Sequence, residues 1–565
     1  MANDLRAPKD ALAKREGFYI IKDSSIQATG FPDGRRKEFY INDDRLISAA
    51  KIVGNVSDEE ILELLKTAEG FKKLVHSVGI SITSENRNSK FNVTMIMYGL
   101  KDMYGGGTRA NLEVVANGVE QVMVFDDIDW SEDDNVLGQF AFAFPDNEEY
   151  AEASVRLYLN DGYHAPEEED EQYIDMSGTE YKKIIAKSLI QPGNNSRIKK
   201  VIDKARRGED VTMAFIGGSI TQGAGAVPIA TECYAYKTFT SFTEKYATDK
   251  SKMHYVKAGV GGTSSELGIV RYDHDVTSNG EIFPDIVVVE FAVNDAGDET
   301  EGECYEGLVR KVWNSKKKPA VILLFSVFAD DYNLQERFIP IGNALRLPMV
   351  SLKDALVEQF NKKADDGRVV SRRQYFYDIF HPTNTGHTIM ADCLMNCFGV
   401  IDSQETDESF DDIPVVKTTD FDDIKFFDRD NINDFVSDFE CGDFDKTDEQ
   451  LQGVERNMDC NLTMLFPDNW MHNEEANDNK PLSFKINCKL LLLVMKDAGE
   501  VNFGKAKVYV DGKLARVFDP HEIGWTHSNA LIVIRENETK LHEVKVVMDD
   551  DSVGKRFTIL GFGMA

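Results

Sequence analysis

The central region of the chain contains the segment Ala214-Phe215-Ile216-Gly217-Gly218-Ser219-Ile220-Thr221-Gln222-Gly223. Its apolar residues predict a short buried strand, and its glycine pair predicts a turn at the end of that strand. The turn lifts Ser219 off the strand. Because a serine hydroxyl is a poor nucleophile until a base takes its proton, a catalytic role for this serine requires a partner elsewhere in the chain.

The partner comes about 160 residues later, in Asp378-Ile379-Phe380-His381-Pro382. A histidine is a good general base when a carboxylate fixes its tautomer. The chain therefore offers a nucleophile, an orienting acid and a base in the order Ser219, Asp378 and His381. We predict these three as the catalytic residues.

Two segments between these blocks can supply hydrogen-bond donors for an oxyanion. The first is Lys257-Ala258-Gly259-Val260-Gly261-Gly262-Thr263, and the second is the apolar run 285–293 that ends in Asn294-Asp295. A glycine lets a backbone N–H approach a ligand closely, and an asparagine offers a side-chain N–H. Acyl transfer needs such donors around the developing negative charge.

Taken together, the four segments resemble the SGNH/GDSL hydrolase superfamily over roughly residues 205 to 400. The resemblance implies that Ser219 is the nucleophile, His381 the base and Asp378 its orienter. It also implies an oxyanion hole formed by the backbone N–H of Ser219 together with Gly262 and Asn294. Neither a cofactor nor a metal is expected.

Three positions depart from the pattern of that superfamily. Gly218 stands where the family usually has aspartate, Lys257 where it has asparagine, and Ala292 where it has glycine. None of the three removes a catalytic group. The departures indicate a divergent branch of the superfamily.

Strands and helices alternate from about residue 185 to residue 400. This alternation predicts an α/β fold, with a parallel sheet flanked by helices and an active site beyond the carboxyl ends of the strands. We expect strands near 254–258, 286–291, 320–325 and 348–352, and helices near 234–246, 264–276 and 303–314. We assign residues 185–400 to the catalytic domain.

The flanking regions are predicted to be rich in strands. Residues 1–184 form a mixed, β-rich accessory domain, in which Ser57 caps a helix that runs to about His76, and Asn117-Gly118 joins two strands. An acidic linker at 401–412 precedes a β-sandwich of jelly-roll type at 413–565. Whether the two β regions form one domain or two is left open.

Composition limits the range of partners. A formal charge of −33 argues against binding nucleic acid or an anionic membrane, and a neutral substrate fits it better. The apolar run Leu490–Met495 is too short to span a membrane. Seven scattered cysteines, and the absence of an apolar signal core at Met1–Arg6, predict a cytoplasmic protein; its oligomeric state is left open.

The resemblance implies a serine esterase that removes O-acetyl groups from carbohydrate, namely oligosaccharides derived from plant polysaccharide. The alternatives are a lipase, thioesterase or peptidase of the same superfamily, and a non-catalytic carbohydrate-binding protein built on a degenerate hydrolase domain. The complete set of Ser219, Asn294, Asp378 and His381 argues against the degenerate form.

Trp525 is the one substrate-binding residue that we predict outside the central region. It lies in the polar, turn-like stretch 521–529, where an indole ring either anchors a neighbouring core or offers a stacking surface. Sugars present C–H faces that pack on indole rings. We predict that Trp525 helps form the active-site cleft, with packing between domains as the alternative.

Overall fold

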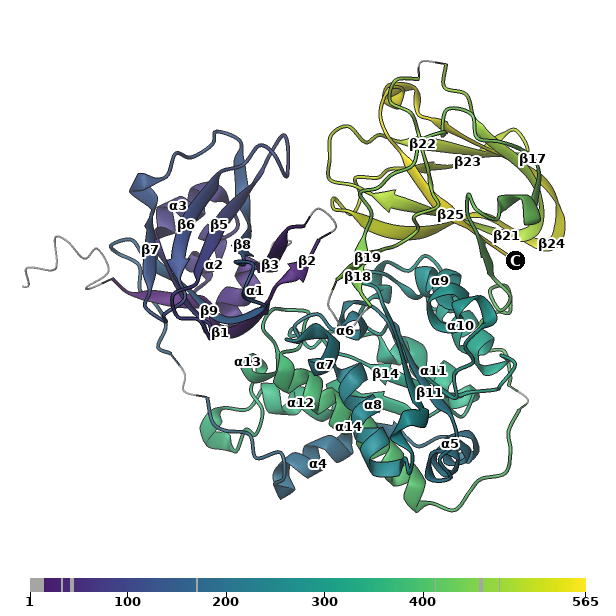
Figure 1. Cartoon of the computed structure of the whole chain (residues 1–565), viewed down its shortest axis with the longest axis horizontal. Helices are drawn as coiled ribbons and strands as arrows, with labels where there is room; N and C mark the ends of the chain where they lie inside the picture. The colour runs from purple at the N-terminus through teal and green to yellow at the C-terminus, as the bar shows by residue number, and fades with distance from the viewer. Residues whose placement is uncertain are drawn as a thin grey trace, which may run out of the picture.

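A computed structural model of the chain describes residues 15–31, 34–40, 45–168, 171–411, 413–456, 461–476 and 478–565. Figure 1 shows three bodies: a β-rich N-terminal part in purple, a central α/β part in teal and green, and a C-terminal β part that ends in yellow. Met1–Arg6, in which we predict no signal core, lies outside the described residues. Within the described ranges, no helix combines the length and the apolar character needed to cross a bilayer.

The central part is built on a six-stranded sheet in the order β10-β15-β14-β13-β11-β12. Its strands are Leu189–Gln191 (β10), Val211–Gly217 (β11), Met253–Gly259 (β12), Ile286–Glu290 (β13), Ala320–Phe325 (β14) and Met349–Ser351 (β15). All neighbouring pairs are parallel except β10 and β15. The α/β prediction is confirmed, while the antiparallel edge strand β10 was not predicted because three half-buried residues carry no clear pattern.

Helices cover both faces of this sheet, so its strands are buried on both sides and read as continuous apolar runs. One face packs against Ser196–Arg206 (α5), Tyr234–Tyr246 (α8), Leu352–Phe360 (α12) and Asn384–Ser403 (α14), and the other against Ser265–Thr277 (α9), Glu303–Trp313 (α10) and Gln335–Ala344 (α11). The bounds of α8 and β14 are those predicted. Helix α14 extends to Ser403, into the segment predicted as linker.

The N-terminal part consists of two antiparallel sheets around one core. The first is Gly17–Gln27 (β1), Tyr150–Leu159 (β9), Val75–Thr83 (β4) and Gln121–Val124 (β7); the second is Thr29–Gly30 (β2), Arg36–Tyr40 (β3), Asp134–Ala143 (β8), Lys90–Gly99 (β5) and Arg109–Val115 (β6). The turn at Asn117-Gly118 therefore does not close a hairpin, since β6 and β7 belong to different sheets.

The single helix predicted from Ser57 to about His76 is wrong. Two short helices, Glu59–Leu64 (α2) and Ala68–Leu74 (α3), take its place. Asp58 caps the first helix by accepting a hydrogen bond from the N–H of Glu60, and Thr67 caps the second. The apolar spacing continues across both helices, which is why the sequence pattern does not reveal the break. A further short helix, Leu46–Ile52 (α1), precedes them.

The C-terminal part is an eight-stranded antiparallel sheet. Its main path runs Lys425–Phe427 (β16), Thr558–Met564 (β25), Leu482–Asp497 (β21), His527–Met548 (β24), Ala506–Val510 (β22) and Lys513–Phe518 (β23), while Val436–Glu440 (β17) pairs with β21 and Trp470–Met471 (β20) with β25. Gly453–Glu455 (β18) and Leu462–Met464 (β19) form a separate two-stranded ribbon.

The apolar run Leu490–Met495 lies within β21 and is buried on both faces. Leu491, Leu493 and Met495 belong to the core of the C-terminal part, whereas Leu490, Leu492 and Val494 share a core with α9 and α10 of the central part. Alternate side chains of a strand point to opposite faces, so a strand between two cores must be apolar throughout. The C-terminal sheet is thereby packed directly onto the catalytic region.

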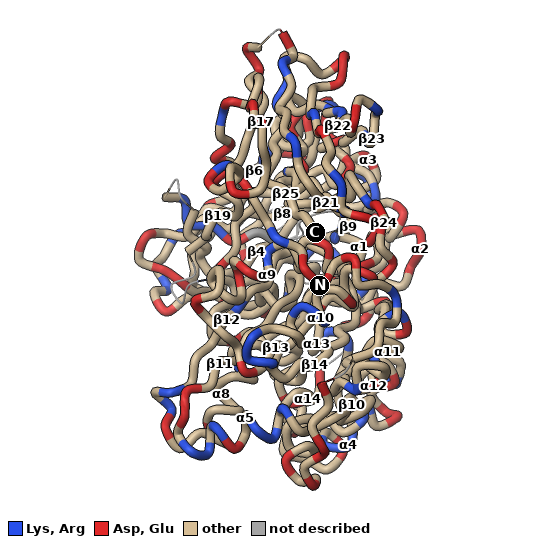
Figure 2. Tube along the Cα trace, turned by 90° about the vertical axis from the view of Figure 1, so that its right-hand side faces the viewer, with Lys and Arg blue, Asp and Glu red and all other residues tan. Residues whose placement is uncertain are grey.

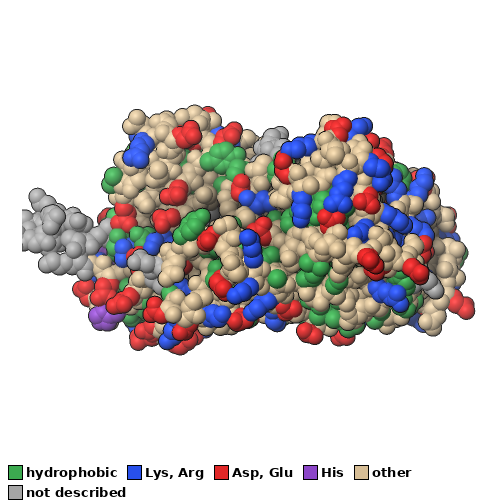
Figure 3. Space-filling view, turned by 90° about the horizontal axis from the view of Figure 1, so that it is seen from below, with side chains coloured by type: hydrophobic (Ala, Val, Ile, Leu, Met, Phe, Trp, Pro, Cys, Tyr) green, Lys and Arg blue, Asp and Glu red, His purple; other side chains and the backbone are tan. Residues whose placement is uncertain are grey.

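The negative charge is spread over the whole molecule. Asp and Glu positions, red along the backbone trace, occur in all three parts (Figure 2). The face seen from below carries acidic and basic side chains interspersed, with hydrophobic side chains in small separate areas (Figure 3).

Candidate active site

Ser219 lies at the carboxyl end of β11, at the first position of the short helix Ser219–Gln222 (α6). Strand β11 is flanked by β12 on one side and β13 on the other, so the chain order reverses at this point of the sheet. Open α/β sheets bind ligands at such a switch point, beyond the strand ends. The position of the predicted nucleophile follows from this topology.

The two glycines before Ser219 are required by packing. A Cβ atom at Gly217 would lie 2.4 Å from the carbonyl oxygen of Glu290, and one at Gly218 would lie 2.2 Å from Oδ1 of Asn294. Both separations are far inside van der Waals contact. The departure at Gly218 therefore has a structural reason, since the side chain of Asn294 occupies the space that an aspartate would need.

Ser219, His381 and Asp378 form a continuous hydrogen-bonded chain. Nε2 of His381 lies 2.9 Å from Oγ of Ser219, and Nδ1 of His381 lies 3.0 Å from Oδ2 of Asp378. A carboxylate only accepts hydrogen bonds, so Nδ1 carries the proton and Nε2 is left to accept from the serine hydroxyl. The three residues predicted from the sequence are thus brought together.

Asp378 is buried, with 3% of its surface exposed. Its Oδ1 accepts hydrogen bonds from the backbone N–H groups of Phe380 and His381 at 2.8 and 2.7 Å. Burial by itself would raise the pKa of this carboxyl group, but the neighbouring His381 and Arg45 and these hydrogen bonds outweigh it and hold the pKa well below its usual range. Asp378 therefore stays ionised.

The two predicted oxyanion donors lie at the ends of the strands that flank β11. Gly262 follows β12 and has a φ of +73°, a conformation that favours glycine. Asn294 follows β13, and its side chain packs against Gly218, next to the nucleophile. Its Oδ1 is buried and has no hydrogen-bond partner among the described residues. The same edge of the sheet thus carries the predicted nucleophile and both candidate donors.

The C-terminal part holds the glycine loop of this candidate oxyanion hole, a role that sequence reasoning missed. Nε2 of Gln452 donates to the carbonyl oxygen of Gly261 at 2.7 Å, and Nε2 of His527 donates to that of Gly262 at 3.0 Å. His527 in turn lies 2.9 Å from the buried carboxylate of Asp497. A sequence pattern gives no signal for these contacts, because Gly262 and His527 are 265 positions apart.

Trp525, predicted to lie at the cleft, is half-buried beside the same loop. A Cβ atom on Gly262 would lie 2.9 Å from Cζ2 of its indole ring. The ring also packs against the imidazole of His527, with centroids 4.8 Å apart. Trp525 thus stands next to a predicted oxyanion donor.

Lys257, the second departure, has a structural partner. Its Nζ donates to the carbonyl oxygen of Gln222 at 2.8 Å, at the end of α6. Gln222 also accepts a hydrogen bond from the N–H of Gly261. Together these contacts tie α6, which begins with Ser219, to the loop that carries Gly261 and Gly262.

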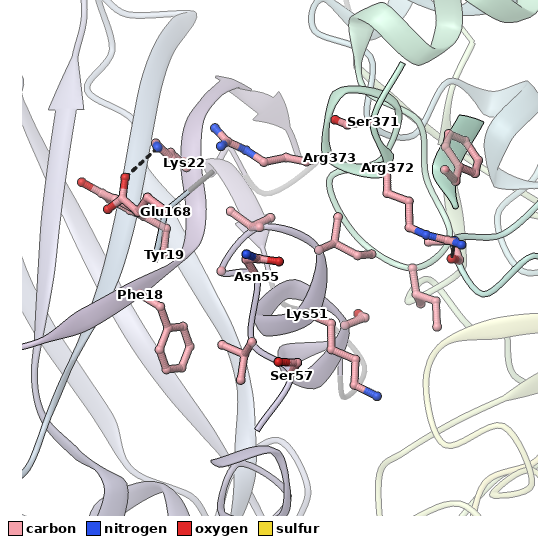
Figure 4. A pocket seen from close by; sticks show the side chains of 18 of the residues that line it. Phe18, Tyr19, Lys22, Lys51, Asn55, Ser57, Glu168, Ser371, Arg372 and Arg373 are labelled. Carbon is pink, nitrogen blue, oxygen red and sulfur yellow. Dashed lines mark hydrogen bonds and ion pairs between the residues drawn. The ribbon is translucent and has the colours of Figure 1, made fainter. Parts of the chain in front are cut away.

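A cavity of about 580 Å³ lies elsewhere. It lies between the N-terminal part, which lines it with β1 and α1, and the segment 368–373 of the central part. Figure 4 shows Arg373 reaching across it toward Lys22 and Glu168, which are joined by an ion pair of 2.9 Å. None of the predicted catalytic or oxyanion residues lines this cavity, so it is separate from the candidate active site.

Comparison with known proteins agrees with this geometry. Residues 215–389 match the model of the GDSL-like Lipase/Acylhydrolase family. Similar solved structures include a two-domain esterase (CEX) active on acetylated mannans and the same esterase co-crystallised with mannopentaose. Both are 25% identical and cover 67% of this chain; they are matched over 98% and 97% of their own length, with TM-scores of 0.57 and 0.55. No curated protein matches the chain.

The family model covers the segment that carries Ser219, Gly262, Asn294, Asp378 and His381. Residues 215–389 carry a GDSL-like lipase/acylhydrolase domain, so the central part is that of a carboxylic ester hydrolase, and the chain resembles SGNH/GDSL carbohydrate esterases.

Proposed function

We propose that this protein is a serine esterase that removes O-acetyl groups from oligosaccharides of plant polysaccharide, acetylated manno-oligosaccharides among them. One observation carries the proposal: the hydrogen-bonded chain from Ser219 through His381 to Asp378 stands at the end of β11. The substrate class is supported by the similarity to the esterase active on acetylated mannans.

In the proposed reaction, Oγ of Ser219 attacks the carbonyl carbon of the acetyl group while Nε2 of His381 takes the hydroxyl proton. The N–H groups of Ser219, Gly262 and Asn294 stabilise the negative charge on the carbonyl oxygen. His381 then gives its proton to the departing sugar oxygen. Water, activated by the same histidine, attacks the acyl-enzyme and releases acetate.

The test is mass spectrometry of acetylated manno- and xylo-oligosaccharides after incubation with the protein. We expect the loss of C₂H₂O for each ester cleaved, with no loss in the presence of the Ser219→Ala variant. Hydrolysis of a small aryl acetate without any change in the oligosaccharides would contradict the carbohydrate assignment. Inactivity on every ester would contradict the esterase itself and favour the non-catalytic alternative.

Short acyl groups are expected to be the preferred substrates. Among the acetate, butyrate and octanoate esters of one alcohol, kcat/KM is expected to be highest for acetate, because an acetyl esterase has to hold only a methyl group beside the reacting carbonyl. Initial rates across the three esters measure this preference. A clear preference for octanoate would favour the lipase alternative.

Trp525→Ala is expected to raise KM for acetylated oligosaccharides several-fold and to leave turnover of a small aryl acetate nearly unchanged. The reason is that only the sugar needs the indole face beside Gly262. The matched variant Trp525→Phe keeps an aromatic face and is expected to recover part of the loss. Equal losses on both substrates would mean that the ring serves to pack the oxyanion loop and not to bind sugar.

A further inference from the structure

Arg45 of the N-terminal part reaches into the candidate active site of the central part. It immediately precedes α1, and its Nη1 donates to Oδ2 of Asp378 at 2.8 Å. The same nitrogen lies 3.4 Å from Nδ1 of His381, and the guanidinium group stands 5.2 Å from the ring centre of Phe380. The charged side chain is only 19% exposed, and that of Asp378 is 4% exposed.

This contact completes the set of donors around the carboxylate. Oδ1 of Asp378 accepts two backbone N–H groups, and Oδ2 accepts Nδ1–H of His381 together with Nη1–H of Arg45. Hydrogen bonds between ionised groups are roughly twice as strong as neutral ones. The carboxylate is therefore held in one orientation from two separate parts of the molecule.

We propose that Arg45 is a positioning residue for the catalytic dyad, so that the N-terminal β-rich part contributes directly to the chemistry of the central part. The inference rests on the proposed function of Ser219, Asp378 and His381. Arg45 acts through Asp378: it fixes the carboxylate that orients His381, and it places a positive charge beside the imidazole.

That charge has a predictable effect on pH dependence. Protonation of His381 creates a second positive charge close to the guanidinium, which opposes protonation. Without the guanidinium, the negative charge of Asp378 stabilises the imidazolium form of His381 with no positive charge beside it to oppose this. The acid limb of kcat/KM is therefore expected to move to higher pH when Arg45 loses its charge.

Among the described residues, Glu290 titrates within the range of the measurement: burial raises its pKa to about 7, and its Oε2 accepts a hydrogen bond from Thr221 behind Ser219. Glu290 is present in wild type and in every variant, so the comparison between them isolates the effect of Arg45.

On the side of β1, the residues that line the small cavity beside Arg45 and Asp378 are Ile20, Ile21 and Ser24, none of which is ionisable. The hydroxyl of Tyr377 lies 3.5 Å from Nδ1 of His381, and a phenol titrates only near pH 10. Burial lowers the pKa of His387 in α14 to about 3, so this histidine stays neutral over the range of the measurement.

The experiment compares the full-length variants Arg45→Gln and Arg45→Lys with wild type on a small aryl acetate from pH 5 to pH 9. Lys51→Gln is the matched control, because it removes a positive charge from α1, the helix that follows Arg45, at an exposed side chain that lines the cavity of Figure 4. Melting temperatures show whether each variant is folded.

For Arg45→Gln we expect kcat to fall roughly tenfold and the acid limb to move up by about half to one pH unit. Arg45→Lys keeps the positive charge, so its acid limb of kcat/KM is expected to fall at the same pH as in wild type. Lys51→Gln is expected to match wild type both in the pH of the acid limb and in kcat. Should Arg45→Gln fail to fold, Arg45→Met, which also removes the charge and keeps an unbranched side chain, is measured in its place and is expected to show the same shift. An unchanged limb in a folded Arg45→Gln protein, or a shift of equal size in Lys51→Gln, overturns the proposal. Inactive wild type would instead overturn the esterase function.

Discussion

Ser219→Ala is expected to lower kcat/KM for a small aryl acetate by several powers of ten, with the protein still folded. The Oγ atom of Ser219 is the group that Nε2 of His381 contacts at 2.9 Å, and alanine removes it without adding bulk. Ser219 is half-buried and loses one hydrogen bond, so the melting temperature is expected to stay close to that of wild type. Initial rates and thermal unfolding measure both effects.

Ser264→Ala is the matched control for this prediction. Ser264 is also half-buried, follows the candidate oxyanion loop, and makes no capping hydrogen bond at the start of α9. Its hydroxyl belongs to no part of the catalytic chain, so its activity is expected to stay near that of wild type. A folded Ser219→Ala protein that retained more than about a tenth of the wild-type rate would refute the assignment of the nucleophile.

Asp378→Asn is expected to reduce kcat by roughly three to four powers of ten, the size of effect known when a triad carboxylate becomes an amide. The carboxylate accepts the Nδ1–H of His381, which leaves Nε2 free to take the serine proton. An amide N–H that faces Nδ1 would reverse the tautomer and place the ring proton on Nε2. The substitution keeps the shape of the site, but His381 can no longer act as the base, because its Nε2 already carries a proton.

The same substitution tests the charge on Asp378. Its pKa is lowered in the folded protein, so ionisation of this group stabilises the fold at pH values above its unfolded pKa of about 3.9, and this stabilisation is lost as the pH falls through the folded value. The difference in urea midpoint between wild type and Asp378→Asn is therefore expected to stay nearly constant from pH 7 down to about pH 4 and to shrink as the pH falls further. A difference that grows toward low pH would show that the carboxyl group is protonated in the folded enzyme.

The sequence by itself determined the central sheet and the residues gathered at its edge. Apolar runs mark β11, β13 and β14, because a strand covered on both faces must be apolar along its length. Ser219 and Asn294 directly follow such runs. Side chains at the carboxyl ends of adjacent parallel strands meet by geometry alone, so a local pattern was enough to find them.

Only the tertiary structure decided which residues from outside the central part reach that edge. Arg45 contacts Asp378 across 333 positions of sequence, and Gln452 contacts Gly261 across 191. It also decided that β6 and β7 enter different sheets. The reason is physical: periodicity and turn residues encode local conformation, whereas a contact between separately folded parts depends on how their surfaces dock. No local pattern in the chain records that docking.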